Sequence, residues 1–103
     1  MIENEVKYFI SEIIATDLEK YVDSEISIEV DYIIHQHDKM RCETACNDLK
    51  QLQHKLLKQA DKFYTIGAIS FSKKCYLDGY IREKIGKSIF YIKTIIYESE
   101  VND

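Results

Sequence analysis

The chain has 103 residues, of which 46% are hydrophobic and 31% are charged, and its formal net charge is −4 at pH 7. This length fits a single domain with a small hydrophobic core. The ordinary apolar content and the mixed charges exclude a disordered chain, a collagen-like repeat and a disulfide scaffold. Three cysteines without a secretory segment indicate reduced thiols. We therefore expect one cytoplasmic domain over residues 1–103, with no membrane contact.

Charge is distributed unevenly along the chain. Residues 1–38 carry ten acidic side chains against two lysines, a net charge of −8, whereas residues 50–93 carry ten basic side chains against three acidic ones, a net charge of +7. Two interpretations stay open. An acidic helix packs beside basic helices of the same chain, or a bipolar surface attracts partners.

The first predicted element is a helix over residues 2–22, because apolar residues recur there at spacings of three and four. They are Ile2, Val6, Phe9, Ile10, Ile13, Ile14, Leu18 and Tyr21. Asp23 and Ser24 then favour the start of a second helix near residue 25. The alternation from Ile26 to Tyr32 is equally typical of a strand, so this stretch stays open between helix and strand.

The second predicted helix covers residues 25–66 and bends near residue 38. Its narrow apolar stripe is typical of a coiled coil or a helical hairpin. The stripe consists of Ala45, Leu49, Leu52, Leu56 and Phe63. Gly67 indicates the end of this helix, and Ser70 or Ser72 indicates the cap of a third helix over residues 69–98, which an acidic tail at 98–103 follows.

These patterns predict an all-α fold, either a small three-helix bundle or a helical hairpin with a long central helix. One signal disagrees. Asp78-Gly79 between apolar and aromatic residues is typical of a β-hairpin, and the Ile, Tyr, Phe and Thr content after Lys62 favours strands. An α+β fold with strands near 26–34 and 63–82 is therefore the alternative.

Two constellations suggest chemistry, and we interpret both as structural. His35, His37, Cys42 and Cys46 are zinc-type ligands within twelve residues, but their spacing matches no standard zinc module. Gly86-Lys87-Ser88 matches only the end of a phosphate-binding loop, because Ile81 stands where the first glycine is needed. No nucleophile or pair of carboxylates has the setting that catalysis requires. We predict neither enzyme activity, nor a metal, nor a cofactor.

The basic and aromatic region 73–93 is the best candidate for binding a partner. Its candidate contact residues are Tyr76, Tyr80, Arg82, Lys84, Lys87 and Tyr91. Aromatic residues in excess of what a small core buries favour a protein partner. Cations interleaved with rings also suit single-stranded nucleic acid.

The predicted function is therefore that of a small non-catalytic cytoplasmic protein that binds another protein. It would act as an adaptor or as a phage-type modulator of host machinery, since the Ile, Lys, Tyr and Asn bias fits an AT-rich phage or bacterial genome. An accessory role on single-stranded nucleic acid is the alternative. We also expect a homodimer, because an apolar stripe this regular has to be covered. The residues assigned to this self-association are Leu49, Leu52, Leu56 and Phe63.

Overall fold

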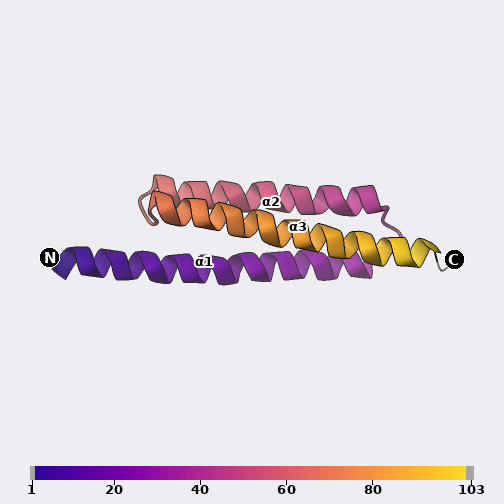
Figure 1. The fold of residues 1–103 in the computed structure, drawn as a ribbon, viewed down its shortest axis with the longest axis horizontal. Helices are drawn as coiled ribbons and strands as arrows, with labels where there is room; N and C mark the ends of the chain where they lie inside the picture. The colour runs from indigo at the N-terminus through magenta and orange to yellow at the C-terminus, as the bar shows by residue number, and fades with distance from the viewer. Residues whose placement is uncertain (1, 102–103) are drawn as a thin grey trace.

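Three α-helices make up the computed structural model, which describes the backbone of residues 2–101 and the side chains of residues 17–99. They are α1 (Ile2–His35), α2 (Cys42–Thr65) and α3 (Phe71–Val101), packed side by side (Figure 1). No strand occurs between residues 2 and 101. The all-α prediction is therefore confirmed, and the α+β alternative with strands near 26–34 and 63–82 is wrong.

Helix α1 is continuous where the sequence predicted two helices. Asp23 does not cap a new helix, because its carboxylate accepts a hydrogen bond from Tyr80 of α3. The predicted bend near residue 38 is instead the connection between α1 and α2, at residues 36–41. The helix predicted over residues 25–66 is thus two helices, and the chain reverses direction between them (Figure 1).

The connection between α2 and α3 follows the sequence prediction closely. Gly67 has a φ of 79°, a left-handed conformation that glycine adopts without steric cost. Its N–H donates to the carbonyl of Tyr64, and the N–H of Ala68 donates to the carbonyl of Phe63, the pair of bonds of a Schellman motif. Ser70 then caps α3, since its Oγ accepts a hydrogen bond from the N–H of Lys73.

The hairpin signal at Asp78-Gly79 is overridden within α3. The Nζ of Lys74 lies 2.8 Å from Oδ2 of Asp78, one helical turn away, so an ion pair within the helix holds this oxygen. The other carboxylate oxygen, Oδ1, is buried without a hydrogen-bond partner. Gly79 is exposed on the same helix. The helix ends at Val101, later than predicted, so most of the predicted acidic tail is helical, while residues 102 and 103 lie outside the described range.

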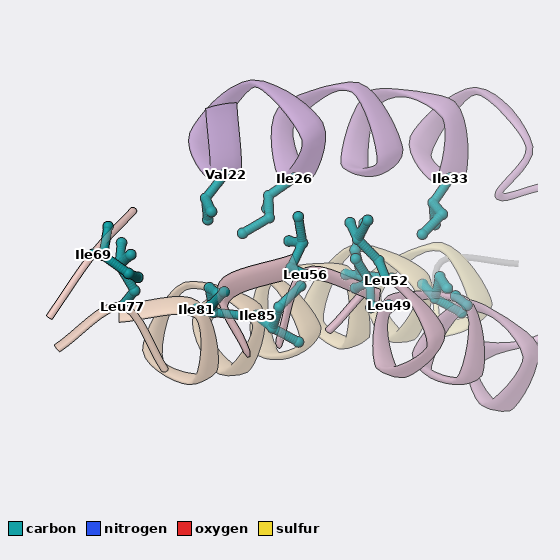
Figure 2. Close-up of a cluster of buried hydrophobic side chains, with 14 residues drawn as sticks. Val22, Ile26, Ile33, Leu49, Leu52, Leu56, Ile69, Leu77, Ile81 and Ile85 are labelled. Atoms are coloured by element: carbon teal, nitrogen blue, oxygen red, sulfur yellow. The ribbon is translucent and has the colours of Figure 1, made fainter. Parts of the chain in front are cut away.

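The core runs along the line where the three helices meet. Side chains of α1 point from one side toward those of α2 and α3 (Figure 2). The most completely buried side chains are Ile33, Leu49, Leu56, Leu77, Ile81, Ile85 and Ile92. Helices α2 and α3 pack most extensively, as an antiparallel hairpin, and α1 lies along this hairpin.

The molecule is a rod of 65 × 17 × 16 Å. Because α1 is the longest helix, its N-terminal end projects beyond the turn that joins α2 and α3 (Figure 1). Within the described part of the chain, no helix has both the length and the apolar character that a membrane span requires.

Candidate partner-binding surfaces

The six residues predicted to bind a partner lie on two sides of α3: Tyr76, Tyr80, Lys84, Lys87 and Tyr91 follow one line along the helix, and Arg82 lies on another side. Tyr76, Tyr80 and Lys84 follow one another at intervals of one turn on the side of α3 that meets α1. The Oη of Tyr80 donates to the carboxylate of Asp23, at 2.9 Å from both of its oxygens. The rings of Tyr76 and Tyr80 stack with their centroids 6.2 Å apart. Lys84 Nζ lies 5.3 Å from the centroid of the Tyr80 ring and 3.7 Å from Oδ1 of Asp23.

These contacts hold α1 against α3. Burial and the hydrogen bond to Asp23 raise the pKa of Tyr80 to about 12. The charge of Glu19, together with a hydrogen bond to the same carboxylate, raises the pKa of Tyr76. Glu19, Asp23, Tyr76, Tyr80 and Lys84 form what we name the tyrosine seam. The tyrosine seam joins α1 to α3 within one chain. Tyr76, Tyr80 and Lys84 therefore already make contacts inside the molecule.

Two more cations of region 73–93 are also paired. The Nζ of Lys87 lies 2.9 Å from Oε1 of Glu83, and this hydrogen bond lowers the pKa of the carboxyl group. Lys74 is paired with Asp78, as described above. With Lys84 beside Asp23, at least half of the six cations in this region have a carboxylate within 4 Å. Such pairing lowers the positive potential that nucleic-acid phosphates would meet.

A different side of α3 presents its large side chains to solvent. Arg82, Gly86, Phe90, Lys93 and Tyr97 are spaced by three or four residues, so they lie along one side of the helix, which we name the outer face of α3. Phe90 is 74% exposed and Tyr97 is 67% exposed.

Sequence reasoning assigned only Arg82 of this face to partner binding. Tyr91, which is 53% exposed, lies on the line of Tyr80, Lys84 and Lys87 instead. Sequence reasoning missed Phe90, Lys93 and Tyr97 as contact residues. One signal in the sequence could have identified them. Their spacing places them on one side of the helix, away from the isoleucines that form the core.

The outer face of α3 borders a shallow hollow of about 560 Å³ near the start of α2. Phe90, Lys93 and Tyr97 line it, together with Cys42 and Glu98. It is therefore an aromatic surface with a lysine at its centre and a carboxylate at one end.

The residues assigned to self-association lie in the core of the single chain. Leu49, Leu52 and Leu56 are only 0%, 9% and 2% exposed, because they pack against α1 and α3, and Phe63 is half-buried beside them. The chain's own helices thus cover the apolar stripe of α2. A dimer seam along Leu49, Leu52 and Leu56 has no accessible surface in this fold.

The zinc-type ligands are separated by the turn between α1 and α2. The ring nitrogen Nδ1 of His35 lies 2.7 Å from the carbonyl oxygen of Asp31, and Nε2 of His37 lies 3.0 Å from Oδ1 of Asp38. Cys46 is buried in α2. Among the residues whose side chains are described, no three histidine, cysteine or carboxylate groups are close enough to hold a metal ion. Gly86-Lys87-Ser88 lies in the middle of α3, where Ser88 Oγ donates to the carbonyl of Lys84.

A second groove lies between α1 and α2, and its volume is about 580 Å³. Leu18, Tyr21, Phe63 and Ile66 supply its apolar lining, and Asp17, Gln59 and Lys62 supply polar groups. Sequence reasoning did not identify this groove, because it depends on α1 lying beside α2.

Comparisons with protein-family models, curated proteins and solved structures give no match to this chain. The surfaces of the chain itself are therefore the basis for a functional proposal.

Proposed function

We propose that this chain is a non-catalytic protein that acts by binding another protein through the outer face of α3. The observation that carries the proposal is the exposure of Phe90 and Tyr97, at 74% and 67%, on one side of a helix whose opposite side is buried. Large amphipathic side chains on a rigid element are the anchors that protein interfaces favour.

The chemistry of this face describes its partner. Two rings separated by two helical turns suit a surface with apolar pockets, and the hollow beside Phe90 and Tyr97 would accept a side chain from that surface. Arg82 and Lys93 are exposed between and beside the rings. The partner therefore carries acidic residues around its apolar pockets. A role as an adaptor or as a phage-type modulator of host machinery fits such a surface.

An accessory role on single-stranded nucleic acid is the second candidate, because region 73–93 interleaves cations and rings. Two observations count against this second role. Tyr76 and Tyr80 stack on each other rather than standing free for bases, and Lys74, Lys84 and Lys87 are paired with carboxylates.

Affinity capture from a lysate of the source cells, with and without nuclease, separates the two candidates. Under the proposal, a specific protein is retained and nuclease treatment leaves it bound. Moderate salt should reduce this retention only slightly, whereas binding to phosphates would fall steeply between low and moderate salt. Loss of the retained protein after nuclease treatment would favour the nucleic-acid role instead.

A further inference from the structure

Helix α1 has apolar side chains on two sides. Val22, Ile26 and Ile33 point into the core (Figure 2). Ile28 and Tyr32 lie on the other side and are 61% and 55% exposed. Asp17, Tyr21, Ile28 and Tyr32 follow one line along the helix, since their spacings of four and seven residues are close to whole turns. We name this line the outer face of α1.

The outer face of α1 continues into the groove between α1 and α2 through Tyr21. The α2 side of this groove is basic, because Lys62 lines it and Lys55 and Lys58 line the adjoining hollow. An apolar floor with a row of lysines along one rim is complementary to an amphipathic helix with acidic residues.

The chain itself supplies such a helix at the N-terminal end of α1. Residues 2–16 carry three glutamates against one lysine, together with apolar residues at helical spacing. The backbone of this end projects past the turn between α2 and α3, so it extends beyond the hairpin that covers the rest of α1 (Figure 1). By spacing, positions 2, 6 and 13 lie within about 60° of Asp17 around the helix axis, on the same side of α1 as Tyr21, Ile28 and Tyr32.

We propose that a second copy of the chain binds here, with the two α1 helices antiparallel and residues 2–16 of each copy alongside residues 21–32 of the other. The two-fold axis passes near Asp17, midway along this side of α1. Positions 13, 6 and 2 of one copy then lie opposite Tyr21, Ile28 and Tyr32 of its partner. The paired segments are about 45 Å long, at 1.5 Å per residue. Both copies use the same surface, as the commonest symmetry of soluble oligomers requires.

Charge sets the strength of this pairing. The acidic N-terminal segment of each copy enters the field of the lysines on the partner's α2, which attracts it. The same segment also lies along the acidic residues 17–32 of the partner's α1, and Asp17 approaches its own symmetry mate at the axis, so like charges of the two α1 helices oppose association. Replacing this carboxylate by an amide, Asp17→Asn, should therefore tighten the dimer severalfold.

Light scattering of the full chain at micromolar concentration tests the proposal. The unmodified chain should have about twice its chain mass of 12.2 kDa. Ile28→Glu and Tyr32→Glu should each reduce this to the mass of one chain. Both side chains are exposed in a single copy, so a helical circular-dichroism spectrum should be retained. Phe90→Glu, on the outer face of α3, is the matched control and should leave the doubled mass unchanged.

A single-chain mass for the unmodified protein across the concentration range would overturn the proposal, as would a doubled mass that survives Ile28→Glu. The first result would leave the outer face of α1 to a different chain. These outcomes are independent of the proposed function, because partner binding is assigned to the outer face of α3 and is read by capture rather than by mass.

Discussion

At the scale of single residues, Gly67 and Gly79 differ in their backbone conformation. Gly67 has a left-handed backbone that closes α2, whereas Gly79 is a helical residue with nothing within 4 Å of an added Cβ atom. Gly67→Ala should cost about 1 kcal/mol, because a side chain strains the left-handed conformation. This corresponds to a decrease of about 4–8 °C in the melting temperature of a domain of this size.

Gly79→Ala is the matched control and should shift the melting temperature upward, since alanine favours a helix by up to about 1 kcal/mol over glycine. Thermal unfolding followed by circular dichroism measures both variants. A stable Gly67→Ala variant would show that the turn between α2 and α3 differs from the Schellman motif.

Tyr80 should make stability depend on pH in the alkaline range. Its pKa is about 12 in the folded chain and about 10 in an unfolded one, so the folded state favours the neutral phenol. The stability that the neutral phenol of Tyr80 contributes is fully present below about pH 10, and it is lost as the pH rises through about 12. Tyr80→Phe should lower the free energy of unfolding by about 0.5 kcal/mol at pH 8, because water screens a bond this exposed.

Denaturant unfolding between pH 8 and pH 12 measures this effect, with Tyr91→Phe as the control for an exposed tyrosine. The free energy of unfolding should fall more steeply above pH 10 for the unmodified chain than for Tyr80→Phe. Parallel curves would mean that the phenol does not bind Asp23 in solution.

At the scale of elements, the sequence predicts α2 and its end well but not the continuity of α1. The stripe of α2 lies on one side only, so its spacing is plainly helical, and Gly67 and Ser70 act as predicted. Ile26, Ile28, Val30 and Tyr32 alternate between the inner and outer sides of α1, and this arrangement imitates the two-residue period of a strand. Local spacing does not reveal that both sides of a helix are apolar.

The two apolar sides of α1 should respond differently to truncation. Ile33 is completely buried, so Ile33→Ala should cost about 2–5 kcal/mol through lost burial and an internal cavity. Ile28 is 61% exposed, and Ile28→Ala should change the stability of a single copy by no more than about 0.5 kcal/mol. Denaturant unfolding at nanomolar concentration, where a weak dimer is dissociated, gives both values. Equal losses would contradict a helical α1 at these positions.

At the scale of the whole molecule, the acidic and basic parts of the chain lie side by side. Lys84 and Asp23 form an ion pair between α1 and α3, as the first interpretation of the charge split expects. Like charges also meet, since burial and the charge of Asp48 on α2 raise the pKa of Glu29 on α1. The sequence predicts the basic and aromatic region of α3, but not its division into the tyrosine seam and the outer face. That division depends on which side α1 covers.

The most direct test of the proposed binding function compares two surface variants in affinity capture from a nuclease-treated lysate. One carries Phe90→Ser and Tyr97→Ser on the outer face of α3, and the other carries Ile28→Ser and Tyr32→Ser on the outer face of α1. All four side chains are more than half exposed, so both variants should fold. We expect the α3 variant to lose a protein that the unmodified chain and the α1 variant retain. Retention of that protein by the α3 variant would contradict the proposed binding surface.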